Sequence, residues 1–136
     1  MFECLEDFVG AWGLSRRIRH HNAPEASFEG EALFSRHSDG LLYHETGELL
    51  VEGQAAFRAE RRYYWRNGSN GMIDVFFGDG REFHSIDRHA PDATHFCDPD
   101  TYNVRYRFES WPIWQAEWRV TGPKKDYLMV STYNKM

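Results

Sequence analysis

Apolar and polar residues alternate along most of this 136-residue chain. Between residues 26 and 38, Phe28, Ala32 and Phe34 share one parity, and Glu29 and Glu31 share the other. A period of two sends successive side chains to opposite faces of an extended strand. The pattern therefore predicts β-strands with one buried face, and it recurs in the later segments of the chain.

Clusters rich in Gly, Pro, Asn and Asp separate the alternating segments. They are Asn22-Ala23-Pro24, Asp39-Gly40, Glu52-Gly53, Asn67-Gly68, Asn70-Gly71, Asp79-Gly80, Ala90-Pro91-Asp92, Asp98-Pro99-Asp100, Trp111-Pro112 and Gly122-Pro123. Such clusters favour tight turns between antiparallel neighbours. We expect nine or ten strands, the number depending on whether residues 93–110 form one bulged strand or two.

The order of elements favours an all-β, up-and-down antiparallel β-barrel that forms a single domain over residues 1–136. Closure into a barrel removes exposed strand edges. Residues 2–9, with apolar positions at three- and four-residue spacing, predict one short N-terminal helix. Small residues at Gly30, Ala32, Ala55 and Ala59 fit an interior with open space; a sandwich with a solid core is the alternative.

The charge balance excludes several classes of partner. The formal net charge is -5, which argues against binding to nucleic acid or to an anionic membrane surface.

No apolar segment is long enough to span a membrane, and the N-terminal residues lack a secretory pattern. We therefore expect a cytoplasmic protein, in which Cys4 and Cys97 are separate thiols; a homo-oligomer is possible.

Charged residues on apolar parities mark a candidate binding site. Arg61 shares its parity with Tyr63 and Trp65, and Arg36 shares its parity with Phe34. A buried charge is costly unless it is paired. Either an anionic ligand binds these arginines, or Arg61 pairs internally with Glu45, or a bulge changes the parity.

The sequence contains 10 Phe, 7 Tyr and 5 Trp, which can line a cavity or simply fill a core. We predict non-catalytic binding of a small, largely apolar ligand that carries an acidic group. The candidate ligand-binding residues are Arg36, Glu45, Phe57, Arg61, Tyr63, Trp65, Tyr106, Trp114 and Trp118. A protein-interaction module with a filled interior is a further alternative.

Residues 84–100 suggest two other kinds of chemistry. The segment holds His84, His89, His95, Cys97, Asp98 and Asp100, but it lacks the paired spacing of a zinc site, so no metal is predicted. An enzyme could use His95, Asp100 and Tyr102 for acid/base catalysis at the mouth of the barrel, or Cys97 as a nucleophile.

Two short motifs resemble those of the lipocalin and calycin barrels. Gly10-Ala11-Trp12 resembles the Gly-x-Trp signature, and Lys125-Asp126-Tyr127 resembles the Thr-Asp-Tyr motif with Lys125 at the Thr position. The resemblance implies that Trp12 closes the barrel floor beneath a basic side chain. The arginine-bearing third motif has no match, and Arg119 or Lys135 could take its place.

Nearly the whole chain also resembles a family of short bacterial lipocalin-like proteins of unknown function. The segments that carry this resemblance are residues 8–12, 28–32, 40–47, 79–84, 95–102 and 118–127. It implies a fold and no activity. The strand count is similar to that of lidless ten-stranded haem barrels, which makes haem binding through His84 or His95 an alternative; no cofactor is predicted.

Overall fold

The computed structural model describes residues 1–89 and 92–136. The turn predicted around Ala90-Pro91 lies outside the described residues. The described chain contains a 3-10 turn, η1 (Leu5–Phe8), a second one, η2 (Ser69–Gly71), and ten strands. The strands are β1 (Gly10–His20), β2 (Ala26–His37), β3 (Gly40–Val51), β4 (Phe57–Asn67), β5 (Ile73–Phe77), β6 (Glu82–Ile86), β7 (Asp92–Cys97), β8 (Asp100–Arg107), β9 (Trp114–Thr121) and β10 (Asp126–Lys135).

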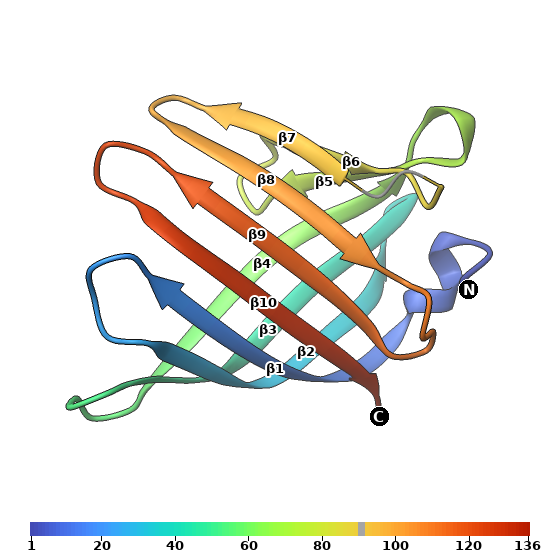
Figure 1. The fold of residues 1–136 in the computed structure, drawn as a ribbon. Coiled ribbons are helices and arrows are strands. Elements are labelled where there is room, and N and C mark those ends of the chain that lie inside the picture. Colours follow the sequence, from blue (N-terminus) through green and yellow to red (C-terminus); the bar gives the residue numbers. More distant parts are fainter. Residues whose placement is uncertain (90–91) are drawn as a thin grey trace.

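The strands form one antiparallel sheet that curls into a nearly closed, lipocalin-like barrel (Figure 1). Their order is β6-β5-β4-β3-β2-β1-β10-β9-β8-β7, so every strand except β6 and β7 pairs with both of its neighbours in sequence or, for β1 and β10, with each other. This confirms the predicted up-and-down barrel. Residues 93–110 contain two strands, because the turn between Cys97 and Asp100 reverses the chain.

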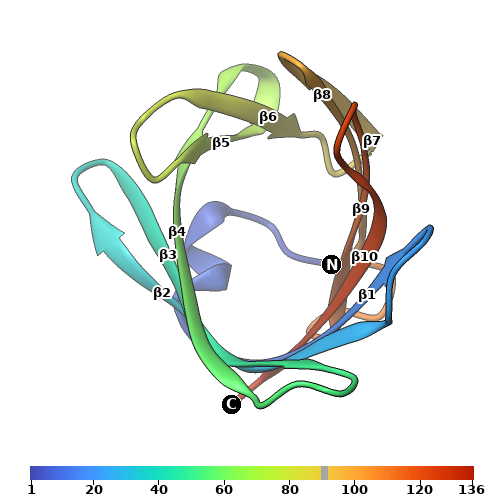
Figure 2. The same ribbon diagram turned by 90° about the vertical axis from the view of Figure 1, so that its left-hand side faces the viewer.

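The two ends of the barrel differ. Seen from one end, the N-terminal segment with η1 lies across the far end, while hairpins surround the near end (Figure 2). We call these the closed end and the open end. The strands at the two ends of the sheet order, β6 and β7, meet without a hydrogen-bonded ladder in the described part of the chain. This junction is called the seam.

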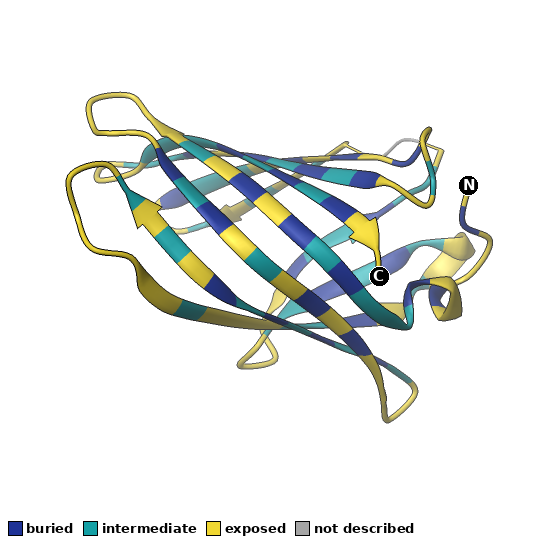
Figure 3. Ribbon diagram, turned by 90° about the horizontal axis from the view of Figure 1, so that it is seen from below, coloured by how far each residue is buried: buried dark blue, intermediate teal, exposed yellow. Residues whose placement is uncertain are grey.

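Burial alternates along the strands as the sequence predicts (Figure 3). In β9, for example, Trp114, Ala116, Trp118 and Val120 are buried, whereas the residues between them are at least partly exposed. The buried side chains fill the barrel interior, which contains a core of aromatic rings.

A glycine pair brings β2 and β3 close together. Gly30 and Gly47 are partners in the ladder, and a Cβ atom on Gly30 would lie 2.1 Å from the carbonyl oxygen of Thr46. Gly30 therefore serves a close approach of two main chains. The expected role of this glycine in opening a cavity is wrong, and Ala55 lies outside the strands and is exposed.

The expected N-terminal helix is also wrong in type. Residues 5–8 form a single 3-10 turn, whose Leu5 and Phe8 side chains are buried.

Cys4 and Cys97 are both free thiols, as predicted. Among the described residues, no helix has the length and apolar character needed to cross a membrane.

Candidate functional site

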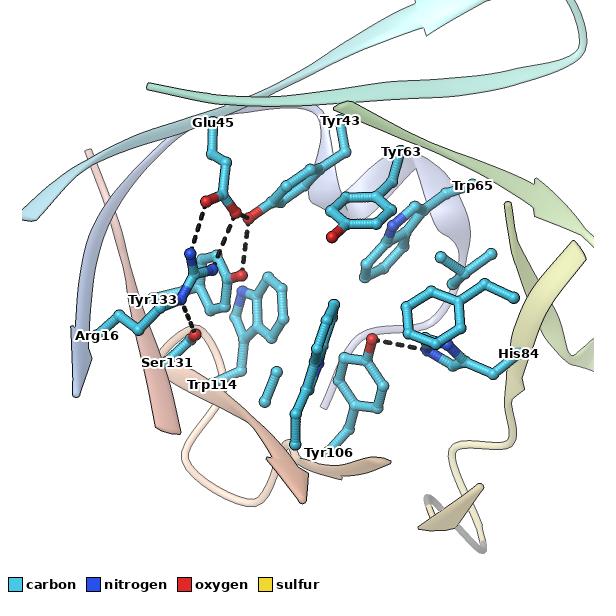
Figure 4. Close-up of a pocket in the computed structure, with 14 residues that line it drawn as sticks. Arg16, Tyr43, Glu45, Tyr63, Trp65, His84, Tyr106, Trp114, Ser131 and Tyr133 are labelled. Atoms are coloured by element: carbon cyan, nitrogen blue, oxygen red, sulfur yellow. Dashed lines mark hydrogen bonds and ion pairs between the residues drawn. The ribbon is translucent and has the colours of Figure 1, made fainter. Parts of the chain in front are cut away.

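A buried ion pair lies on the inner face of the barrel. Arg16 Nη1 donates to Glu45 Oε2 at 2.6 Å, and Nη2 donates to Glu45 Oε1 at 2.9 Å. Arg16 Nε donates to Ser131 Oγ at 2.7 Å. The Tyr43 hydroxyl donates to Glu45 at 2.6 Å and lies 2.8 Å from the Tyr133 hydroxyl. Figure 4 shows the network on one side of the interior.

This network shifts the protonation equilibria of its members. Burial alone raises the pKa of the Glu45 carboxyl, but the hydrogen bonds and charge of Arg16 outweigh burial, and the pKa is lowered. Burial raises the pKa of Tyr133 to about 12 and holds the pKa of Tyr43 well above its usual value. At neutral pH the pair is therefore ionised and the two tyrosines are neutral.

The sequence analysis missed Arg16, together with Tyr43, Ser131 and Tyr133. Arg16 lies in β1 on the inner face with Trp12 and Leu14. Its place in the alternating pattern, two residues after Leu14, could have identified it as a buried charge. The guanidinium also lies over the Phe28 ring at 5.2 Å from the centroid. Both oxygens of Glu45 accept from Arg16, and among the described residues Arg61 is not within ion-pair distance of Glu45, so the alternative pair is not formed.

Arg61 lies on the inner face near the open end. It pairs with Glu45 in the β3–β4 ladder, and its side chain is exposed at the mouth. Although the residue as a whole is exposed, its guanidinium is partly enclosed beside Tyr63. The resulting desolvation acts to lower the pKa of Arg61, but the Tyr63 hydroxyl outweighs it and the pKa is raised. Within residues 1–89 and 92–136, Arg61 forms no ion pair.

Two predicted ligand-binding residues lie outside the interior. Arg36 shares the inner parity of Phe34 but lies past the buried part of β2, where its side chain is 70% exposed and pairs with Glu6. Phe57 is the first residue of β4 and is 50% exposed at the open end. Their expected positions inside the barrel are wrong, because parity gives the face of a strand and not the depth.

The remaining six candidates line one interior cavity. They are Glu45, Tyr63, Trp65, Tyr106, Trp114 and Trp118. The cavity volume is about 20 Å³, enough for roughly one water molecule, whereas ligand pockets usually reach about 300 Å³. The expected open interior is therefore wrong for this conformation, because aromatic side chains fill the space.

His84 lies on the opposite side of the cavity from the ion pair (Figure 4). Its Nε2 is 2.9 Å from the Tyr106 hydroxyl, and its Nδ1 has no hydrogen-bond partner in the described structure. Burial, with a smaller contribution from His95, lowers the pKa of His84 to about 3. The imidazole is thus neutral at every pH at which the protein would ordinarily be handled.

The depressed pKa of His84 predicts a loss of stability in mild acid. Below the usual pKa of 6.5, the unfolded chain protonates His84 and the folded chain does not. The free energy of unfolding should therefore fall as pH is lowered from about 6.5 towards 4.5, by up to about 1.4 kcal/mol per pH unit. Urea denaturation of the wild type, of His84→Gln and of the exposed control His89→Gln measures this; an unchanged slope in His84→Gln would contradict it.

The residues of the enzyme hypothesis are only partly brought together. His95 and Tyr102 are partners in the β7–β8 ladder, but Asp100 forms an ion pair with Lys125 Nζ at 2.9 Å. No three His, Cys, Asp or Glu side chains gather as a metal site among the described residues. A cavity of about 20 Å³ has no room for a haem beside His84.

The closed end is built around Trp12, which is fully buried. Its Nε1 donates to the Phe8 carbonyl oxygen at 2.8 Å. Lys135 Nζ lies 4.6 Å from the centre of the Trp12 ring and donates to the Val9 carbonyl oxygen at 3.0 Å. Of the two basic residues considered from the sequence, Lys135 is the one over Trp12, and Arg119 pairs with Asp126.

Two solved structures share this architecture. A de novo designed fluorescence-activating β-barrel has 10% sequence identity and a TM-score of 0.56, with 100% of both chains covered. The S-type phycobiliprotein lyase CPES from Guillardia theta has 10% identity and a TM-score of 0.56, covering 97% of this chain and 90% of its own. At these identities the similarity shows the fold alone.

Comparison by sequence gives a family and no curated relative. No curated protein shows significant similarity to the chain. The profile of a family of unknown function, DUF6314, matches residues 8–135. Because the match spans almost the whole barrel, from η1 to the end of β10, the chain belongs to the DUF6314 family.

Proposed function

We propose that the protein binds a small, largely apolar molecule that carries an acidic group, at the open end of the barrel. The observation that carries this proposal is the unpaired charge of Arg61. Arg16 and Glu45 neutralise each other inside the barrel, and Arg61 adds a positive charge without an ion-pair partner in the described chain. A ligand carboxylate would supply the missing negative charge.

The surroundings of Arg61 suit such a ligand. A guanidinium can hold a carboxylate through two parallel hydrogen bonds, and the Tyr63 hydroxyl beside it offers another donor. The charge of Arg61 also acts on Tyr127 from β10. The centres of the Tyr63 and Trp118 rings lie 6.1 Å apart, and these two rings supply apolar surface next to Arg61.

The fold supports the small-molecule part of the proposal. The structural neighbours are described as a fluorescence-activating barrel and as a phycobiliprotein lyase, and barrels of this size commonly hold one small ligand. The acidic group is argued from Arg61 alone, so the test must separate charge recognition from apolar binding.

Arg61→Met is expected to weaken acid binding selectively. Met keeps much of the stem volume and removes the charged donors, which contribute roughly 1.5–3 kcal/mol. Affinity for 2-naphthoate should fall by about 10- to 100-fold, while affinity for the uncharged 2-naphthamide should be unchanged. Isothermal titration calorimetry with both compounds measures this.

The exposed Arg62→Met variant on the same strand is the matched control and should bind both compounds as the wild type does. An equal loss of 2-naphthoate affinity in the two variants would mean that Arg61 contributes only general surface charge. Unchanged 2-naphthoate affinity in Arg61→Met would overturn the proposal that this residue binds the acidic group.

A further inference from the structure

Phe83 is enclosed by other aromatic rings. It is 2% exposed and stacks on Phe77 with ring centres 4.3 Å apart and planes at 13°. The edges of Trp118 and Tyr102 meet it at 5.1 and 5.3 Å, and Tyr63 lies 6.2 Å away. We call Phe77, Trp118, Tyr102 and Tyr63 the aromatic cage. Stacked and edge-on contacts of this kind would hold any flat apolar group.

The main chain at Phe83 is not tied into the β5–β6 ladder. Val75 pairs with His84, and the next pair joins Phe76 to Glu82, so Phe83 is the extra residue of a β-bulge. A bulge redirects a side chain and leaves one residue unpaired. Here it turns both Phe83 and His84 towards the interior cavity, and movement of Phe83 breaks no ladder pair.

The other edge of β6 faces the seam. A groove of about 220 Å³ is lined by residues of β5 and β6 and by His95 of β7. Val75, Phe83 and His84 line both this groove and the interior cavity, so these side chains form the partition between them. A phenyl ring that leaves the cage thus has space into which it can turn.

We propose that Phe83 occupies the subsite for a flat aromatic group of the ligand. When the ligand binds, this group displaces the Phe83 ring from the aromatic cage, and the ring moves out through the seam. The inference rests on the proposed function, because Arg61 must hold the acidic group. It accounts for the small cavity volume, since the protein fills its own site in the unliganded state. Because one ring replaces another, the contacts of the cage are retained.

The position of Tyr63 narrows the class of ligand. Its ring is one wall of the cage, and its hydroxyl neighbours Arg61. A ligand that reaches both must carry its acidic group close to its flat group. The geometry therefore favours aryl or conjugated carboxylates over long-chain fatty acids.

Phe83→Ala empties the cage and is expected to raise affinity for 2-naphthoate by about 10-fold or more, since the ligand no longer displaces a buried ring. Phe34→Ala is the matched control, because Phe34 is equally buried, at 1% exposure, and packs 5.0 Å from Tyr43 on another part of the sheet. Its cavity should not favour 2-naphthoate over 2-naphthamide. Arg61→Met in the Phe83→Ala background should remove the preference for the acid.

A measurement with the full-sized ring does not depend on the folding of these variants. With 4-fluorophenylalanine at position 83, saturating 2-naphthoate should move the fluorine resonance towards that of a solvent-exposed ring. The same label at position 34 should not respond. An unmoved resonance at position 83 under saturation overturns the inference, as does unchanged 2-naphthoate affinity in folded Phe83→Ala.

The two proposals fail in different ways. If Arg61→Met weakens 2-naphthoate binding and the fluorine signal at position 83 stays fixed, the proposed function stands and the cage is not the subsite. If Phe83→Ala raises the affinity for 2-naphthoate and Arg61→Met leaves that affinity unchanged in both backgrounds, the cage is the subsite and acid recognition by Arg61 is wrong. Absence of 2-naphthoate binding to every variant overturns both.

Discussion

Arg16→Met is expected to destabilise the unliganded protein by about 3–5 kcal/mol, because it strands a buried carboxylate. The Glu45 side chain is 2% exposed, and without Arg16 it keeps only the hydrogen bond from Tyr43. Its pKa should then rise above the usual value, since burial is no longer outweighed. The loss of stability should shrink as pH falls and the carboxyl gains a proton.

Glu45→Gln should cost a similar amount, since the guanidinium of Arg16 cannot lose its charge. The double variant, Arg16→Met with Glu45→Gln, leaves no buried charge and should be more stable than either single variant. Urea denaturation followed by tryptophan fluorescence measures all three. Additive losses in the double variant would show that the two side chains contribute independently of their ion pair.

The alternation of residues was sufficient to predict the sheet because each strand has one face in the core. The three- and four-residue spacing of the apolar residues among residues 2–9 was less reliable, because it predicted a helix. A single 3-10 turn places Phe2, Leu5 and Phe8 in the core, and a segment this short gains little from helical hydrogen bonds. Packing against the barrel end, which lies far away in sequence, decides its conformation.

The candidate site was only partly predictable because its central contact crosses a strand. Arg16 in β1 reaches Glu45 in β3, and β2 lies between them. At that level β2 presents Ala32, the ladder partner of both Trp12 and Glu45, so a small side chain leaves space for the ion pair. The sequence showed this alanine and both charges, but only the curvature and register of three strands show that they meet.

Depth along the barrel was the second property that parity could not supply. Arg36 and Phe57 lie on inner-face positions beyond the enclosed part of their strands, while Arg61 lies between the enclosed part and the mouth. The bulge at Phe83 was equally hidden, because one additional residue in a five-residue strand leaves no clear period. These four positions determine which side chains a ligand could meet.

Trp12→Ala is expected to destabilise the protein by about 3–5 kcal/mol, the usual cost of truncating a buried tryptophan. The substitution empties the space beside Trp111 and Trp114, whose ring centres lie 5.4 and 5.9 Å away. It also removes the hydrogen bond to the Phe8 carbonyl oxygen, leaving a buried acceptor unpaired. Thermal and urea unfolding should both show the loss.

Lys135→Met separates the packing of Trp12 from the cation above it. Lys135 is exposed, so losing its charge should cost no more than about 1 kcal/mol. A loss as large as that of Trp12→Ala would mean that the cation, and not the packed ring, holds the closed end. Because Trp12 lies at the opposite end from Arg61, folded Trp12→Ala should keep the wild-type affinity for 2-naphthoate. A change in that affinity would show that the two ends of the barrel are coupled.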